Sequence, residues 1–193
     1  MMKPAIRALL AGAALAAWLP NAMATVLSFD DLAQDGTLPV SYGGLDWSAA
    51  GWTVFSTPAD PYTPKSGNGR VATGFLAADA ASLIRFVKPG TFDGAYFAGL
   101  GGATLSFELF LNGAKVHSST VLDPSATPSF LASGYAGLID AVVVKSANHG
   151  EFAMDDFTFT QAVPEPQTYA LLIGGLFVVG HIARRRQSNT NEA

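Results

Sequence analysis

Between residues 25 and 161 the chain alternates short apolar and polar runs, with turn-forming residues between them. A period of two places apolar side chains on one face of a β-strand and polar side chains on the other. Strands are predicted at residues 26–32, 51–56, 70–76, 82–87, 94–98, 104–111, 114–122, 139–146 and 152–160. Long amphipathic helical patterns are absent from this region. The pattern therefore predicts an all-β fold, an antiparallel β-sandwich, for residues 25–161.

The clearest hairpin joins residues 104–111 to residues 114–122 through Asn112 and Gly113. Asn-Gly suits a two-residue type I′ turn, because both residues tolerate positive φ. Alternation along the first strand predicts one shared face for Leu105, Phe107, Leu109 and Leu111. The core side of this hairpin is thereby assigned.

The last predicted strand, residues 152–160, resembles the closing strand of the jelly-roll modules common in secreted and carbohydrate-binding proteins. The first, residues 26–32, is predicted to lie beside it. This resemblance in strand pattern implies a jelly-roll-like arrangement of the sandwich.

The N-terminus has the three parts of an export signal: Lys3 and Arg7, an apolar run, and a small-residue cleavage site. Ala22 and Ala24 suit the narrow pockets of signal peptidase, so cleavage is expected between Ala24 and Thr25. Residues 1–24 are therefore predicted to be a signal helix that is removed. The alternative, an N-terminal membrane anchor, is disfavoured because the apolar run is short.

Three elements follow one another at the C-terminus: a Pro-rich linker at 162–168, a hydrophobic helix with an arginine cluster at 169–186, and a polar tail at 187–193. The apolar part, 169–183, has 15 residues, and as a helix it is about 22 Å long against a hydrocarbon core of about 30 Å. It is predicted to be a marginal transmembrane helix. The arginines are expected to stay on the cytoplasmic side, which leaves residues 25–161 outside.

These elements carry a family resemblance at the following residues: Val163, Pro164, Glu165, Pro166, Arg184, Arg185 and Arg186. Together with the apolar helix, they resemble a PEP-CTERM sorting signal. The resemblance implies removal of the tail near the Pro-Glu-Pro motif by an exosortase, a membrane-embedded enzyme. It also implies export across the inner membrane of an exopolysaccharide-producing Gram-negative bacterium, to the envelope, the matrix or the medium. The alternative is a permanent tail anchor on a structural protein.

Residues 25–161 carry 13 acidic and 6 basic residues. Phosphate binding needs clustered Lys and Arg, so no nucleic-acid partner is expected. The chain has no cysteine, which excludes disulfides and thiolate metal sites. Its glycine-rich loops lack the following helix of a nucleotide cradle, so no organic cofactor is expected.

Four carboxylates form a candidate calcium site, because Ca²⁺ prefers several such oxygens. They lie on the first and last predicted strands: Asp30, Asp31, Asp155 and Asp156. If those strands pair, the carboxylates converge. The alternative is that these acids mark strand ends facing water. A second use of paired carboxylates is glycoside hydrolysis across a cleft, which makes an extracellular hydrolase the alternative function.

Aromatic residues are concentrated between positions 42 and 62. Trp52 and Phe55 are predicted to pack in the core, whereas Trp47 and Tyr62, beside turns, are the candidates for stacking on sugars. His117 and His149 lie outside any metal-ligand or nucleophile motif and are expected to be packed or solvated. The sequence thus favours a non-enzymatic, exported protein with polysaccharide as a candidate ligand.

Overall fold

The computed structural model describes residues 23–49, 51–74 and 78–162, and six helical residues between 172 and 180. Residues 22–162 form one compact unit. The predicted sorting residues 163–166 and 184–186, and Ala22 of the cleavage site, lie outside the described residues. Within the described part of the chain, no helix is both long and apolar enough to cross a membrane. The predictions for both ends therefore stay predictions.

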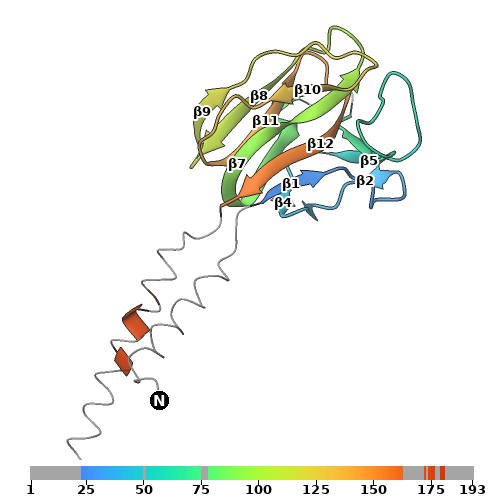
Figure 1. Cartoon of the computed structure of the whole chain (residues 1–193). Helices are drawn as coiled ribbons and strands as arrows, with labels where there is room; N and C mark the ends of the chain where they lie inside the picture. Colours follow the sequence, from blue (N-terminus) through green and yellow to red (C-terminus); the bar gives the residue numbers. More distant parts are fainter. Residues whose placement is uncertain are drawn as a thin grey trace, which may run out of the picture. The chain divides into compact units, whose positions relative to one another are not determined.

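The unit of residues 22–162 is built almost entirely from β-strands (Figure 1). The elements are β1 (Ala24–Leu27), β2 (Gly36–Thr37), β3 (Ser41–Tyr42), β4 (Leu45–Asp46), β5 (Thr53–Phe55), β6 (Arg70–Ala72), the 3-10 helix η2 (Asp79–Ser82), β7 (Leu83–Gly99), β8 (Leu105–Leu111), β9 (Ala114–Ser118), β10 (Ser129–Ala132), β11 (Ile139–Ser146) and β12 (Phe152–Gln161). All of the described strand pairs are antiparallel.

The 17-residue strand β7 belongs to two layers. Its N-terminal half pairs with β4 and β11, and its C-terminal half pairs with β10 and β12. The strand changes partners at Gly90, which lies opposite both Ile139 and Gln161. A Cβ at Gly90 would lie 2.4 Å from the Thr160 carbonyl oxygen, so this close approach requires glycine.

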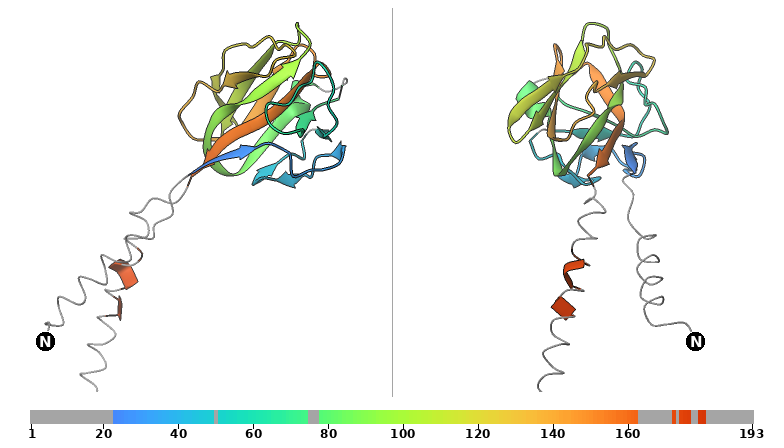
Figure 2. Two further views of the ribbon diagram at one scale, coloured as in Figure 1. Left: turned by 45° about the vertical axis from the view of Figure 1, so that its right-hand side comes forward. Right: turned by 60° about the vertical axis from the view of Figure 1, so that its left-hand side comes forward.

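Two sheets result, and Figure 2 shows their strands from two further sides. The first sheet runs β2, β5, β6, β12, β7 and β10, with β1 also beside β12. The second runs β3, β4, β7, β11, β8 and β9. The predicted all-β antiparallel sandwich is therefore confirmed, and so is the pairing of the first and last strands.

Aromatic side chains fill the space between the sheets. Phe107 of the second sheet packs against Phe92 and Phe97 of the first, with ring centroids 4.8 and 5.7 Å apart. Trp47 packs edge-on against Trp52 at 5.7 Å and against Phe157 at 5.9 Å. Burial of such large apolar side chains is the main stabilising contribution to a fold without disulfides.

The hairpin predicted at residues 104–122 is present as β8 and β9. Asn112 and Gly113 have φ of 53° and 77°, as a type I′ turn requires. Leu105, Phe107 and Leu109 are fully buried, which confirms the predicted core face, whereas Leu111 is half-buried. The prediction of separate strands at 82–87 and 94–98 is wrong, because both segments belong to β7.

Candidate ligand-binding face

The outer face of the first sheet carries one row of side chains that crosses five strands. The register places Phe55 opposite Arg70 and Tyr96 opposite both Asp155 and Phe130. The pair Met154 and Val71 sets the register of β12 and β6, which puts Asp155 beside Arg70. Side chains at paired positions share a face. The row is therefore Phe55, Arg70, Asp155, Tyr96 and Phe130, and it has aromatic residues at both ends.

A β-bulge in β12 places the two acidic residues of this strand. The register to β7 shifts after Asp155, and Asp156 has a φ of 47°. Asp tolerates this left-handed conformation better than most residues. The bulge also changes which residues of β12 face the core. Phe152 and Met154, at even positions, are buried before it, and Phe157, at an odd position, is buried after it. One extra residue thus leaves two adjacent carboxylates outside the core.

These carboxylates hold the segment between β5 and β6, residues 56–69, which we call the strap. Asp155 Oδ2 accepts hydrogen bonds from the backbone amides of Lys65 at 2.7 Å and Ser66 at 2.9 Å. Asp156 Oδ1 accepts one from Ser66 Oγ at 2.8 Å. The strap is the large loop beside β5 in Figure 1, and these contacts attach it to the middle of the row.

The other end of the strap is held by the turn after β1. The prediction that Asp30 and Asp31 lie on the first strand is wrong, because β1 ends at Leu27. Asp30 Oδ1 accepts hydrogen bonds from the amides of Asn68 and Gly69, both at 2.8 Å. Asp31 accepts one from the Tyr42 hydroxyl at 2.5 Å. Burial of the phenol and this neighbouring carboxylate both raise the pKa of Tyr42.

Three of the four predicted carboxylates thus bind the strap, whereas Asp31 binds Tyr42. The donors that Asp30, Asp155 and Asp156 bind are amides and a hydroxyl of residues 65–69. Among the described residues, no group of three or more His, Cys, Asp or Glu is arranged to hold a metal ion. The calcium prediction gains no support from this arrangement, because Ca²⁺ needs several converging oxygens.

Asp155 is the most perturbed acid of this face. It is 3% exposed. Burial raises the pKa of Asp155 to about 7, and the neighbouring Asp156 charge adds to the effect. The amides of Ser66, Asp156 and Lys65 favour the ionised form and act in the opposite direction. Asp155 therefore changes its charge near neutral pH beneath the strap.

A pocket of about 320 Å³ opens at the β5 end of the row. This volume lies in the range of small-ligand sites. Its lining residues are Thr53, Phe55, Ala59, Tyr62, Arg70, Ala72, Thr73, Gly74, Gly150, Phe152 and Ala153. Besides the rings of Phe55, Tyr62 and Phe152, most of the lining residues are small. We call this cavity the strap pocket.

Arg70 fixes one wall of the strap pocket. The side chain is 3% exposed, and its Nη2 donates to the Thr57 carbonyl oxygen at 2.7 Å. The guanidinium carbon lies 5.8 Å from the centroid of the Phe55 ring. Burial lowers the pKa of Arg70, and the Asp35 and Asp155 charges oppose this. Arg70 thereby joins the strap to the Phe55 ring.

A second aromatic pair lies at the β10 end of the row. Phe130 is 43% exposed, and its ring centroid lies 5.0 Å from that of Tyr96. Lys65, whose amide is bound to Asp155, places its Nζ 5.0 Å from the Tyr96 ring centroid. The strap therefore contributes Tyr62 to one end of the row and Lys65 to the other.

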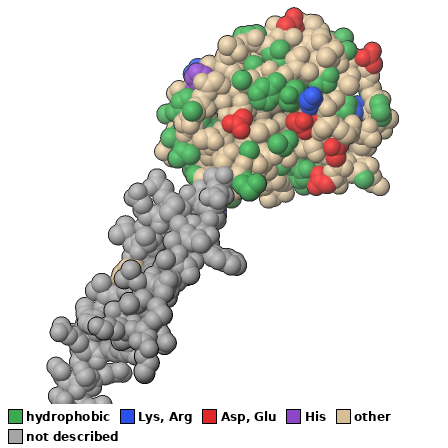
Figure 3. Space-filling model, viewed as in Figure 1, with side chains coloured by type: hydrophobic (Ala, Val, Ile, Leu, Met, Phe, Trp, Pro, Cys, Tyr) green, Lys and Arg blue, Asp and Glu red, His purple; other side chains and the backbone are tan. Residues whose placement is uncertain are grey.

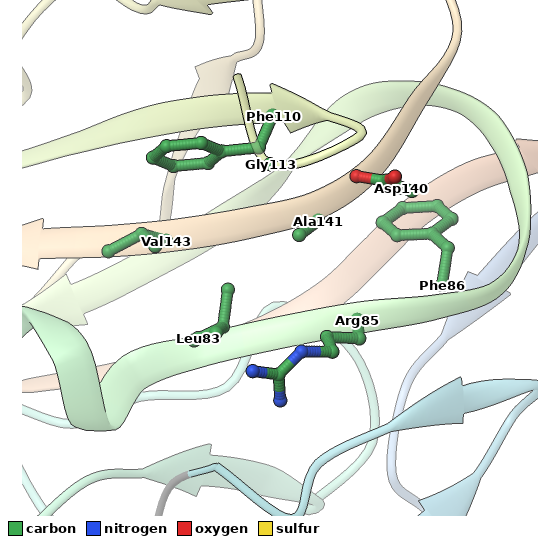
Figure 4. Close-up of a pocket in the computed structure, with 8 residues that line it drawn as sticks. All are labelled: Leu83, Arg85, Phe86, Phe110, Gly113, Asp140, Ala141 and Val143. Atoms are coloured by element: carbon green, nitrogen blue, oxygen red, sulfur yellow. The ribbon is translucent and has the colours of Figure 1, made fainter. Parts of the chain in front are cut away.

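The outer face of the second sheet has a groove of about 430 Å³ (Figure 4). It is lined by Leu83, Arg85, Phe86, Phe110, Gly113, Asp140, Ala141 and Val143. Phe86 is almost fully buried, so Phe110 is the partly exposed ring. Arg85 extends away from Asp140 in this view. The groove thus has one partly exposed ring, whereas Phe55 and Tyr62 both line the strap pocket.

The structure separates the sequence-predicted aromatic candidates. The prediction of Trp47 as a surface residue is wrong: it is 1% exposed, and its Nε1 donates to the Tyr42 carbonyl oxygen at 3.0 Å. The turn beside Trp47 directs the indole into the aromatic core. Trp52 is buried as predicted, whereas Phe55 is half-buried and lines the strap pocket with Tyr62.

The two histidines of this unit have structural contacts. His149 is 5% exposed, its Nε2 lies 3.0 Å from Asp79 Oδ1, and its carbonyl oxygen accepts from Thr73 Oγ1 at 3.1 Å. His117 stacks on Tyr135 with ring centroids 5.5 Å apart. The expectation that both are packed or solvated is confirmed.

Acidic side chains outnumber basic ones on the face shown in Figure 3, in agreement with the excess of 13 acidic over 6 basic residues in 25–161. No basic stripe crosses that view. The charge distribution on this face therefore gives no support to a polyanionic partner.

No protein-family model and no curated protein sequence match this chain. Among solved structures, a family 29 carbohydrate-binding module complexed with mannohexaose is similar, with a TM-score of 0.39 and 13% identity over 73% of this chain and 93% of that chain. Another structure of such a module has a TM-score of 0.38 and 12% identity over 73% of this chain and 90% of that chain. These values are too low to carry an argument about the ligand. What the chain itself defines is an all-β antiparallel sandwich with a strapped, aromatic outer face.

Proposed function

We propose that residues 25–161 form a non-enzymatic, polysaccharide-binding domain of an exported protein. The observation that carries this proposal is the strap pocket, whose lining combines the aromatic side chains of Phe55 and Tyr62 with small residues. Aromatic rings stack on the apolar faces of sugars, and the hydroxyl of Thr53 in the same lining offers a polar contact. A pocket with apolar walls and few polar groups is the usual form of a small-ligand site.

Two matched variants test this site. Tyr62→Ala and Phe55→Ala remove one aromatic wall each, while Phe110→Ala removes a half-buried ring from the other sheet and serves as the control. Affinity electrophoresis against a panel of soluble polysaccharides identifies a ligand, and calorimetry measures its affinity. We expect each pocket variant to lose about tenfold or more in affinity, about 1.4 kcal/mol. Equal weakening by Phe110→Ala would assign binding to the groove instead.

We also propose that the chain is exported and that its tail is a temporary address. The support is in the sequence: the signal pattern ending at Ala24, and the PEP-CTERM resemblance from Val163 to Arg186. The resemblance implies signal peptidase and an exosortase-like enzyme as partners, and the membrane as a transient one. The short, glycine-containing apolar segment at 169–183 disfavours a permanent anchor.

Intact-mass measurement of the protein from its native cell surface tests both processing steps. The mature chain is expected to begin at Thr25 and to lack residues 174–193. Retention of residues 174–193 would favour the permanently anchored structural protein. Retention of residues 1–24 would contradict cleavage after Ala24.

The hydrolase alternative finds one favourable observation in Asp155, since a carboxyl group with a pKa of about 7 suits a general acid. Its burial at 3% exposure, with Oδ2 bound to two strap amides, opposes this role. Incubation with the polysaccharide that binds is expected to release no reducing ends. Release that disappears in Asp155→Asn would establish hydrolysis in place of simple binding.

A further inference from the structure

We infer that the ligand of this face is a neutral polysaccharide chain that crosses the strands of the first sheet and occupies two aromatic subsites. This inference rests on the proposed function. The first subsite is the strap pocket, with Phe55 and Tyr62. The second is the pair Tyr96 and Phe130, with Lys65 over the Tyr96 ring.

The register sets the direction and the length of the site. Phe55 and Phe130 are the ends of one cross-strand row on β5, β6, β12, β7 and β10. Four strand spacings separate the two residues, and at roughly 4.8 Å each the row is about 19 Å long. A disaccharide is too short to reach both ends. A longer chain lying perpendicular to the strands reaches both by passing over the strap, which covers Arg70 and Asp155 in the middle of the row.

The strap couples the two subsites. Its Tyr62 lines the first, and its Lys65 covers part of the second. The amides of Lys65 and Ser66 are fixed to Asp155 in the middle of the row, so the residues on either side keep a constant spacing. Such preorganisation lowers the entropic cost of binding an extended ligand.

The second subsite offers an exposed aromatic ring on which a sugar can stack. Phe130 is 43% exposed although a phenylalanine on a sheet face gains by burial. Lys65 has no ion-pair partner among the described residues, so its ammonium group is free to donate to hydroxyl groups next to the rings. Stacking on Phe130 and donation from Lys65 act on the same sugar unit.

The negative charge of residues 25–161 favours a neutral polysaccharide over an acidic one. Residues 25–161 have seven more acidic than basic residues, and acidic side chains are spread over the face seen in Figure 3. A polyanion would be repelled by the net negative charge of residues 25–161. Arg70 cannot offset it, because this guanidinium is buried and donates to the strap. Lys65 places one positive charge at the second subsite, against an excess of seven acidic residues in 25–161.

Calorimetry with oligosaccharide series tests the inference on the full-length protein. The probes are neutral cello- and manno-oligosaccharides and acidic oligogalacturonates of two, four and six units. For a neutral series that binds, we expect the hexasaccharide to bind at least about tenfold more tightly than the disaccharide. Phe130→Ala should lower hexasaccharide affinity to nearly the disaccharide value and leave the disaccharide unaffected. Tyr62→Ala should weaken both, and Phe110→Ala neither.

The outcomes separate the two proposals. Equal affinity for all lengths, or a Phe130→Ala variant with unchanged hexasaccharide affinity, overturns the two-subsite inference and leaves polysaccharide binding in place. Preference for oligogalacturonates overturns the assignment of a neutral ligand. If neither series binds and the polysaccharide panel is also negative, the proposed function itself fails, and the two-subsite inference fails with it.

Discussion

The stability of this protein is expected to fall as the pH rises from about 4 to about 7, because of Asp155. The folded carboxyl has a pKa of about 7, against 3.8 for the unfolded side chain. Between these values the unfolded state binds fewer protons than the folded state, so the free energy of unfolding decreases with rising pH. Below pH 3.8 this contribution is fully favourable, and above pH 7 it is constant.

The size of this loss of stability follows from the folded and unfolded pKa values of Asp155. Each pH unit in the interval contributes up to about 1.4 kcal/mol, so the interval from 3.8 to about 7 contributes at most about 4 kcal/mol. Relaxation of the strap reduces this value, and we expect a loss of about 1 to 4 kcal/mol. The variant Asp155→Asn keeps an acceptor for the amides of Lys65 and Ser66 but does not titrate. The free energy of unfolding of Asp155→Asn should therefore not show the decrease between pH 4 and 7 that Asp155 causes.

Urea denaturation between pH 3.5 and 8, followed by tryptophan fluorescence, measures the effect, since Trp47 and Trp52 are buried in the core. The informative quantity is the difference in the free energy of unfolding between wild type and Asp155→Asn at each pH. The contributions of the other titrating groups cancel in this difference. Asp93→Asn, at an exposed acid on β7, is the control. A difference that does not change between pH 4 and 7 would refute the reasoning that burial holds the Asp155 proton.

Two further predictions concern packing. Trp47→Phe should destabilise the protein about 1 kcal/mol more than Trp52→Phe, because Trp47 Nε1 donates a hydrogen bond whereas Trp52 Nε1 has no partner among the described residues; equal losses in urea denaturation would contradict this. Gly99→Ala should cost more than about 2 kcal/mol, since a Cβ there would lie 2.1 Å from the Glu151 carbonyl oxygen. Gly36→Ala, with nothing within 4 Å of the added Cβ, should change stability by less than about 1 kcal/mol. Thermal unfolding of the two glycine variants, compared with wild type, checks this contrast.

The hairpin of β8 and β9 could be predicted almost completely from the sequence. Its signals are local: a run with a period of two, and Asn112-Gly113 at positions that need positive φ. The pairing of β1 with β12 was also predictable, from the similar patterns of the first and last runs. Local propensity and the core pattern agree in these segments, so short-range information was sufficient.

The continuity of β7 could not be predicted in the same way. Lys88, Pro89 and Gly90 interrupt the apolar pattern and suggest a turn between two strands. In the structure these residues lie where the strand passes from one sheet to the other, and Ala162 donates to the Pro89 carbonyl oxygen at 3.1 Å. The partners that keep the chain extended are far away in sequence. Two-residue strands such as β2 and β3 depend on tertiary pairing for the same reason.

The candidate site was predictable in part. Tyr62 was singled out because it lies beside turns, and the structure places it in the lining of the strap pocket. That the carboxylates bind the strap depends on contacts across 38 to 90 residues. The sequence did not mark Phe130 and Tyr96 as site residues. Their rings lie side by side because of the register of β10 against β7, which the sequence pattern does not fix.

The strap explains why acidic residues occur in the middle of this face. A row of aromatic residues on an unstrapped sheet would leave an open surface, whereas the bulge at Asp155 and Asp156 supplies acceptors for the amides of residues 65–66. The cost is a carboxyl group that is buried and hard to ionise. The gain is a loop fixed at its centre, with Tyr62 on one side and Lys65 on the other. Since the same hydrogen bonds position both subsites, weakening them by Asp155→Ala should impair long and short ligands together, unlike the selective effect of Phe130→Ala.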